Sequence, residues 1–229
     1  RNMLGCVFII IPVLLIAKQP DLGTALLVAM SGFTVIFIAG MSWRLVTALS
    51  VMVTAVMPVL WHFLHDYQKR RVWTFLDPEQ DPLGAGYHII QSKIAIGSGG
   101  MYGKGWLNGT QSHLEFLPER TTDFIFAVFS EEFGFMGAVL LISIYLFVVA
   151  RGLTIAVSAQ QTYAKLLATG LVFAFFISVF INIGMVTGQL PVVGVPLPFI
   201  SHGGTAVVSL MAAFGILMSI HTHRRMLSD

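Results

Sequence analysis

Charged residues are scarce in this chain: Asp, Glu, Lys and Arg make up 10% of its 229 residues, whereas 56% are hydrophobic. A soluble globular domain carries about 25% charged residues, so the composition excludes that class and indicates a polytopic membrane protein. The mean hydropathy of +0.82 agrees with this class. The net charge of +2 is too small to indicate a nucleic-acid partner, and the basic residues are scattered.

Cysteine is nearly absent as well. The single Cys6 excludes a disulfide framework and a cysteine metal site. His62 and His65 are three residues apart, but no HExxH motif or third ligand accompanies them. The Gly-x-Ser-Gly and Gly-x-Gly-Asp patterns of intramembrane proteases are also missing. We therefore assign no metal site and no protease activity from the sequence.

Six apolar runs reach or approach the length of about 20 residues that a helix needs to cross a bilayer. They predict six transmembrane helices, at Met3–Ala17, Leu22–Gly40, Leu45–Leu64, Phe133–Ala150, Leu166–Val186 and Ala206–Ile220. The predicted fold class is an all-α polytopic membrane protein with one integral membrane domain over residues 1–229. Because the chain does not begin with Met, we expect it to be part of a longer protein.

The basic residues of the short connections predict the orientation of these helices. If the helices alternate in direction, Arg44, Arg151, Lys165, Arg224 and Arg225 fall on one side, together with His221 and His223. The positive-inside rule makes that side cytoplasmic. We therefore expect both chain ends in the cytoplasm.

Two irregular segments are then expected on the outer side. Residues 65–122 form a long, polar, glycine-punctuated segment that carries half of the charged residues. Lipid accepts backbone only as a helix or a closed barrel, so this segment must lie outside the hydrocarbon or in a wet cavity. A loop of this length is usually functional. Residues 188–205, rich in Pro and Gly, form a second such loop, which we expect to pack against the first. We expect Asn182 to bond to a neighbouring helix.

Within the long loop, Tyr87, Ile90 and Ile94, with Ala95 as a further candidate, recur at helical spacing and predict a short amphipathic helix. It could lie at the membrane interface or pack on the transmembrane helices. The glycine-rich run that follows is not a phosphate-binding P-loop, because Ser98 and Gly105 occupy the positions of the required Gly and Ser/Thr. Two alternatives remain: a flexible turn, or a backbone that approaches a diphosphate with Lys104 as counter-charge.

Asp123 ends the long loop at the edge of an apolar run. A structural interpretation has Thr121 or Thr122 capping a helix, with Asp123 in its first turn, where the helix dipole favours a carboxylate. A functional interpretation rests on position, because ionisable groups at membrane depth are costly and tend to be functional. Glu131 and Glu132 follow, and we do not expect either to form a close carboxylate pair with Asp123.

Several ordered motifs resemble those of the SEDS (shape, elongation, division and sporulation) family. They are Gln19-Pro20-Asp21-Leu22-Gly23-Thr24, Ile94-Ala95-Ile96-Gly97-Ser98-Gly99-Gly100, Leu117-Pro118-Glu119 with Thr122-Asp123-Phe124, Glu131-Glu132-x-Gly134, and Pro196-Leu197-Pro198 with Ser201-x-Gly203-Gly204. The resemblance covers essentially the whole chain and is closer to the elongation type than to the division type. One departure is His202, where the family commonly has Tyr. The resemblance implies a ten-helix fold of which this chain is the C-terminal six.

The resemblance also implies an activity, glycosyl transfer from lipid II (a disaccharide-pentapeptide on undecaprenyl diphosphate) to a growing peptidoglycan strand. Asp123 matches the essential carboxylate and would act as general base. Candidate substrate-binding residues are Arg70, Arg71, Gln91, Lys93, Ser98, Lys104, Glu119, Thr122 and Ser201. No cofactor is assigned, and the sequence leaves open whether a divalent cation bridges Asp123 and the diphosphate. The implied partners are a class B penicillin-binding protein and other elongation-complex proteins in the bacterial inner membrane.

Two other functions compete with this one. A flippase for a lipid-linked cell-wall precursor would place its ionisable groups near the midplane of the membrane, whereas the predicted helices here carry almost no charge. A non-enzymatic scaffold of the wall-synthesis complex would tolerate the loss of Asp123. Both alternatives are therefore distinguishable from a polymerase by experiment.

Overall fold

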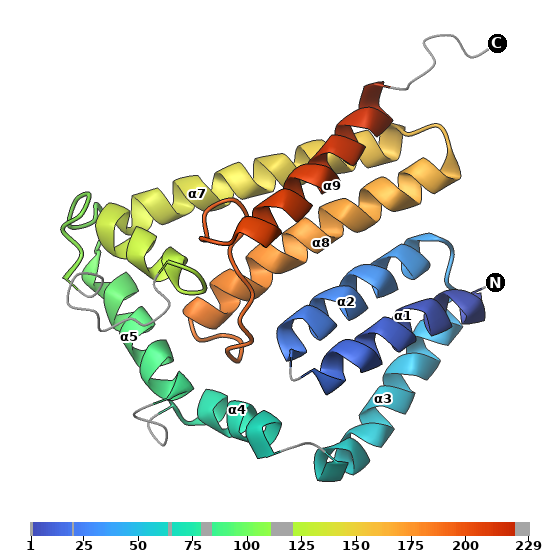
Figure 1. Ribbon diagram of the computed structural model, residues 1–229, viewed down its shortest axis with the longest axis horizontal. Helices are drawn as coiled ribbons and strands as arrows, with labels where there is room; N and C mark the ends of the chain where they lie inside the picture. The colour runs from blue at the N-terminus through green and yellow to red at the C-terminus, as the bar shows by residue number, and fades with distance from the viewer. Residues whose placement is uncertain (1, 20, 64–65, 79–83, 111–120, 223–229) are drawn as a thin grey trace.

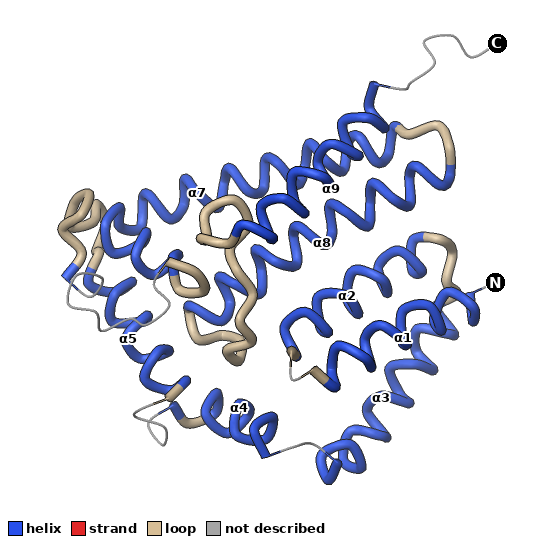
Figure 2. The backbone as a smooth tube through the Cα atoms, in the orientation of Figure 1, coloured by secondary structure: helices blue, strands red, loops and turns tan. Residues whose placement is uncertain are grey.

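The computed structural model describes residues 2–19, 21–63, 66–78, 84–110 and 121–222. Within these ranges the chain is helical, with loops and no strand (Figure 2). The helices labelled in Figure 1 are α1 (Asn2–Lys18), α2 (Leu22–Ile38), α3 (Trp43–Phe63), α4 (Asp66–Leu76), α5 (Ala85–Ser98), α7 (Ile125–Ser158), α8 (Thr162–Val186) and α9 (Gly204–Thr222). The predicted all-α fold class is confirmed.

Each of the six predicted apolar runs lies largely within a helix. Three helices of the described chain are long and apolar enough to cross a membrane, namely α7, α8 and α9. The apolar helices α1 and α2 are 17 residues long. The six-span count and the ten-helix fold stay predictions. The fourth helix differs from its predicted start, because α7 begins at Ile125 rather than at Phe133 and so includes both glutamates.

The helices alternate in direction along the chain, as Figure 1 shows. The start of α1, the α2–α3 turn, the α7–α8 turn and the end of α9 lie toward the right of that view, while the opposite ends of the helices lie toward the left. Helix α7 packs along α8, and α9 packs on both. Helix α2 packs against both α1 and α8. The basic residues Arg44 and Lys165, in the first turns of α3 and α8, therefore belong to the same end of the molecule.

The long loop is more structured than the sequence predicts, since it contains both α4 and α5. Helix α5 packs on α7 and α8 and buries Ile89, Ser92 and Ala95. The predicted apolar face is confirmed in part: Ala95 is buried and Tyr87 and Ile90 are half-buried, whereas Ile94 is 46% exposed. The predicted packing of this helix on the apolar helices is confirmed, and its position at the membrane interface stays a prediction. The Ser92 hydroxyl supports that packing by donating to the Val186 carbonyl at 2.8 Å.

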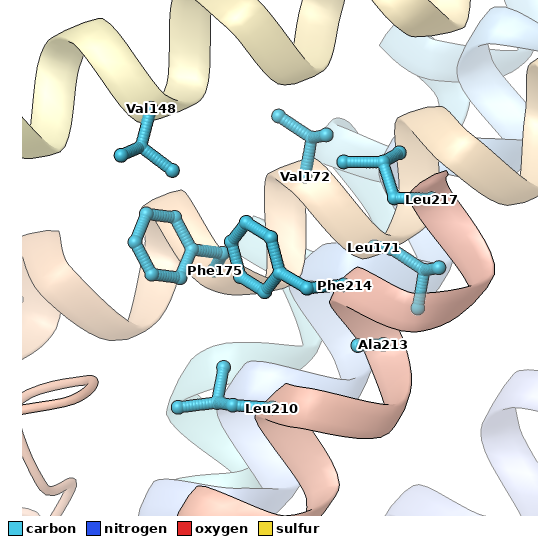
Figure 3. A pocket seen from close by; sticks show the side chains of 8 residues that line it. All are labelled: Val148, Leu171, Val172, Phe175, Leu210, Ala213, Phe214 and Leu217. Carbon is cyan, nitrogen blue, oxygen red and sulfur yellow. The ribbon is translucent and has the colours of Figure 1, made fainter. Parts of the chain in front are cut away.

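A small apolar cavity of about 20 Å³ lies between α7, α8 and α9. Figure 3 shows its lining, in which the rings of Phe175 and Phe214 lie side by side, with Val148 and Val172 above them and Leu210 below. No polar side chain lines it. A volume that holds about one water-sized probe, without polar partners for a water, stays dry. This cavity is therefore part of the packing and not a candidate site.

Candidate active site around Asp123

Asp123 lies in the turn that immediately precedes α7. The helix begins at Ile125 with Phe124 as its N-cap, and the N-cap side chain makes no capping hydrogen bond. The first turn of α7 contains no acidic residue. The predicted capping by Thr121 or Thr122, with Asp123 inside the first turn, is therefore wrong. Asp123 stands outside the helix on its N-terminal side, while Phe124, 1% exposed, is inserted into the core.

Three hydrogen bonds fix the main chain around Asp123. Asn182 Nδ2 donates to the Asp123 carbonyl at 2.8 Å. The Ser201 hydroxyl donates to the Thr122 carbonyl, and the His202 N–H donates to the Thr121 carbonyl at 2.8 Å. The turn is thus bonded to α8 and to the loop before α9. His202 serves through its main chain, so the departure from the family's common Tyr leaves this bond intact.

Asn182 is fully buried in α8 and joins two loops. Its Nδ2 also donates to the Val195 carbonyl at 2.8 Å. The predicted structural role of Asn182 is confirmed, but its partners are the main-chain carbonyls of two loops instead of another helix. A buried amide is the suitable side chain here, because one NH2 group offers a donor to each of the two main-chain carbonyls.

We expect Asn182→Ala to destabilise the protein by about 1–3 kcal/mol, because one buried and one half-buried main-chain carbonyl lose their donor. Thermal unfolding in detergent measures this change. The matched control is Ser178→Ala, one turn earlier in α8, whose hydroxyl donates only to the Ala174 carbonyl of its own helix. Equal midpoints for Asn182→Ala and Ser178→Ala would contradict the role given to Asn182.

The proline-rich segment before α9 forms the opposite wall of the site. The buried Ser201 hydroxyl accepts from the Leu197 N–H at 2.7 Å, and the Tyr145 hydroxyl of α7 donates to the Pro198 carbonyl at 2.6 Å. Gly194 lies against the Asp123 carboxylate, since a Cβ at Gly194 would be 3.4 Å from Asp123 Oδ2. The carboxylate therefore faces a stretch of main chain that has no side chain at the point of contact.

A cavity of about 480 Å³ adjoins this segment, between α2, α8 and α9. It is lined by residues 195–199, by Ser201 and by hydroxyl side chains of the three helices: Thr24, Ser178, Thr205 and Ser209. The first turn of α2 completes this wall, with Gly23 in direct contact with the Val193 carbonyl. Several motifs that are distant in the sequence thus converge within reach of Asp123.

A second polar cluster surrounds Glu131, further along α7 from Asp123. Glu131 is fully buried in α7 and pairs with Lys104, with 2.7 Å between Lys104 Nζ and Glu131 Oε1. Thr110 donates to the same carboxylate oxygen at 3.1 Å, and Ser98 donates to it at 3.4 Å. From the sequence, Lys104 was a candidate counter-charge for a diphosphate, Ser98 was a candidate substrate-binding residue, and Glu131 had no predicted role. The available signal was the cost of an acidic residue within an apolar run, which calls for a charged partner.

The remaining predicted site residues are dispersed. Gln91 is half-buried on α5, and the Lys93 side chain lies directly over Gly188 at the end of α8. Arg70 and Arg71 are in α4, but their side chains lie outside what the structure describes, as does Glu119 altogether. The structure therefore brings Asp123 together with Thr122 and Ser201. It places Ser98 and Lys104 in the Glu131 cluster.

The described residues include no group of three or more His, Cys, Asp or Glu side chains that could hold a metal ion. A magnesium ion bound through one carboxylate and substrate phosphates needs no such group. Asp123 alone would suit that kind of binding. A divalent cation here therefore stays a proposal.

Comparisons with known proteins place the chain in a family. The profile of the FTSW_RODA_SPOVE family, described as cell cycle proteins, matches residues 2–226. The peptidoglycan glycosyltransferase MrdB of Escherichia coli strain K12 is 62% identical over 226 residues, which are 98% of this chain and 61% of that protein. The peptidoglycan glycosyltransferase RodA of Treponema pallidum is 47% identical over 161 residues, 70% of this chain and 37% of that protein.

Solved structures give the same result. A chain of a peptidoglycan synthase complex that coordinates polymerization and crosslinking matches with a TM-score of 0.81 and 35% identity, over 98% of this chain and 62% of that one. The rod shape determining protein RodA of Thermus thermophilus matches with a TM-score of 0.65 and 26% identity, over 99% of this chain and 57% of that one. The chain belongs to the FtsW/RodA/SpoVE family, which confirms the predicted membership. It spans about 60% of the length of the curated MrdB relative.

Proposed function

We propose that this chain contributes the catalytic part of a peptidoglycan glycosyltransferase that polymerises lipid II for cell-wall elongation. The observation that carries the proposal is the placement of Asp123. Its main chain is fixed by α8, while its carboxylate faces the Gly194 main chain beside the loop before α9. The 62% identity to a protein named peptidoglycan glycosyltransferase supports the same activity.

The chemistry that we assign to Asp123 is general base catalysis. An acceptor sugar hydroxyl attacks the anomeric carbon of the donor, the new C–O bond forms, and the bond from that carbon to the diphosphate oxygen breaks. The hydroxyl proton passes to the Asp123 carboxylate, and the undecaprenyl diphosphate leaves with the bonding electron pair. A positioned base contributes about 10²- to 10⁴-fold to such a step. Inversion at the anomeric carbon requires one base and one leaving-group clamp.

The leaving group develops negative charge, which calls for cations or hydrogen-bond donors at its position. Among the described candidates, Lys93 is exposed and reaches the start of the loop that follows α8. Lys104, by contrast, already serves a buried carboxylate. We therefore favour Lys93 over Lys104 for this role. A divalent cation, if bound, would add charge neutralisation between Asp123 and the diphosphate.

The orientation in the membrane is part of this proposal. Asp123 and the loop before α9 belong to the helix ends opposite the α2–α3 and α7–α8 turns (Figure 1). If the basic turns face the cytoplasm, Asp123 lies at the outer boundary of the inner membrane, where a lipid-anchored donor is held at a fixed depth. A class B penicillin-binding protein would then crosslink the new strands on the same side.

The test is polymerisation of lipid II by the full-length protein with its penicillin-binding partner, with glycan strands resolved on a gel. We expect strands from the wild type. A parallel vesicle assay measures movement of lipid II between leaflets. Movement of lipid II without any polymer would replace the glycosyltransferase with a flippase. The absence of both, with assembly of the wall-synthesis complex intact, would favour a scaffold.

A further inference from the structure

Helix α7 is broken near its start, and the break is filled by another part of the chain. Gly134 has φ +67° and ψ −165°, a conformation essentially confined to glycine. The segment Ile125–Phe133 before it runs in a different direction from the rest of α7, as Figure 1 shows. The long apolar part of α7 therefore does not determine the orientation of this first segment.

The glycine-rich loop after α5 supplies the hydrogen bonds that the break removes. In a continuous helix, the N–H groups of Phe135 and Met136 would donate to the carbonyls of Glu131 and Glu132. Here they donate to the carbonyls of Gly100 and Met101, at 2.8 and 3.1 Å. The Glu131 and Glu132 carbonyls accept instead from the N–H groups of Lys104 and Gly105, both at 3.0 Å. All four main-chain groups are thus satisfied by the loop.

Main-chain contact this close requires glycine on both sides. A Cβ at Gly103 would overlap the Glu132 carbonyl, and a Cβ at Gly134 would overlap the Gly103 N–H. Gly103 itself has φ +79°. The loop and the break are therefore interlocked, and we call the main-chain bonds between residues 100–105 and 131–136 the interlock. Neither alternative from the sequence, a flexible turn or a free diphosphate-binding backbone, describes this stretch.

The Lys104–Glu131 ion pair adds a side-chain interaction to the main-chain bonds of the interlock. The ammonium and the carboxylate come from the same two residues whose main chains bond across the break. Glu131 is fully buried and Lys104 is 28% exposed, so solvent screens this pair less than it would a surface pair. Thr110, which also accepts from Lys104 Nζ at 2.8 Å, joins the far end of the loop to the pair.

The first segment of α7 consequently has two anchors. At its start, Asn182, Ser201 and His202 bond to the turn that carries Asp123. At its end, the interlock bonds to Glu131 and Glu132. The distance from Ile125 to Glu131 is about 9 Å along the helix axis, at about 1.5 Å per residue. Over so short a rigid piece, a change of angle at the interlock displaces Asp123.

We propose that Lys104 and Glu131 are a positioning pair for the Asp123 carboxylate, and that Lys104 acts through Glu131 and not on the substrate. The inference rests on the proposed glycosyltransferase function. It assigns the glycine-rich loop a defined task, which is to set the angle of the first segment of α7. A displacement of about 1 Å at a reacting group can cost about 10²-fold in rate.

The experiment compares Lys104→Met, Glu131→Gln and the double variant in the full-length protein with its partner. We expect each single variant to lower kcat by about 10- to 100-fold while KM for lipid II stays within about twofold. The double variant should be no worse than the worse single variant, because the two residues act as a unit. Lys104→Arg, which keeps a cation able to bond to Glu131, should retain most of the activity. Lys165→Met, the same substitution in the first turn of α8, is the matched control.

Hydrogen exchange gives a readout that does not depend on activity. The Gly105 N–H, which donates to the Glu132 carbonyl, should exchange at least about tenfold faster in Lys104→Met and in Glu131→Gln than in the wild type. A rise in KM with unchanged kcat for Lys104→Met, or losses that multiply in the double variant, would overturn the inference and return Lys104 to the substrate. Unchanged exchange at Gly105 in both single variants would also overturn it. A wild type that makes no polymer would instead remove the proposed function, while the exchange result would still decide the interlock.

Discussion

Asp123→Asn is expected to lower the rate of lipid II polymerisation by about 10²- to 10⁴-fold, the usual contribution of a general base. Asparagine has nearly the shape of aspartate but cannot take the proton from the attacking hydroxyl. The hydrogen bonds that hold the turn should survive, because Asn182 donates to the main-chain carbonyl of Asp123. The variant should therefore unfold near the wild-type temperature and lose activity only. Glycan strand formation on a gel, at matched protein levels in the membrane, measures the effect.

Asp21→Asn is the matched control for this variant. Asp21 caps α2 by accepting from the Thr24 N–H at 2.9 Å, and asparagine caps a helix about as well as aspartate. We therefore expect Asp21→Asn to polymerise lipid II at close to the wild-type rate. Wild-type rates from Asp123→Asn would remove Asp123 as the base. Equal losses from both variants would show that the loss does not depend on the position of Asp123.

Gly134→Ala is expected to destabilise the protein and to impair polymerisation together. Alanine at φ +67° and ψ −165° costs about 1–3 kcal/mol in backbone strain alone. For a chain of this size, such a change lowers the midpoint of thermal unfolding by between about 2 and 12 °C. The new Cβ would also overlap the Gly103 main chain, so the loop would have to withdraw from α7. Thermal unfolding in detergent, followed by the polymerisation assay, measures both effects.

Gly97→Ala is the control with the same chemical change. Gly97 lies in α5, and a Cβ there would meet nothing within 4 Å. Alanine at such a helical position is usually neutral or stabilising by up to about 1 kcal/mol. A Gly134→Ala protein as stable as Gly97→Ala would contradict the interlock, because the break would then tolerate an ordinary residue and a displaced loop.

The helices were largely predictable from the sequence because hydropathy over a long window is a strong signal. The six apolar runs and the alternation of their direction all reappear in the structure. The local signals within the long loop were weaker. Ile94 and Ala95 were both candidates for the apolar face of α5, yet Ala95 is buried and Ile94 is 46% exposed. A short helix has too few residues for periodicity alone to determine which side faces a partner.

The site was predictable in part. Asp123 could be found because it matches a family motif and ends a polar loop at the edge of an apolar run. Asn182 could be identified as a buried donor, but its two carbonyl partners are 13 and 59 residues away in the sequence. The Lys104–Glu131 pair spans 27 residues, and no periodic pattern links its members. Lys104 was therefore a candidate counter-charge for a diphosphate, whereas its ammonium pairs with the buried Glu131 carboxylate.

The sequence by itself determined the membrane class, the family and the identity of the proposed catalytic carboxylate, because composition and motifs are local properties of the chain. The tertiary structure decided what holds that carboxylate: the break at Gly134, the loop that fills it and the bonds from Asn182 and Ser201. The physical reason is that buried main-chain groups must find hydrogen-bond partners wherever the fold provides them. Those partners come from segments that only packing brings together.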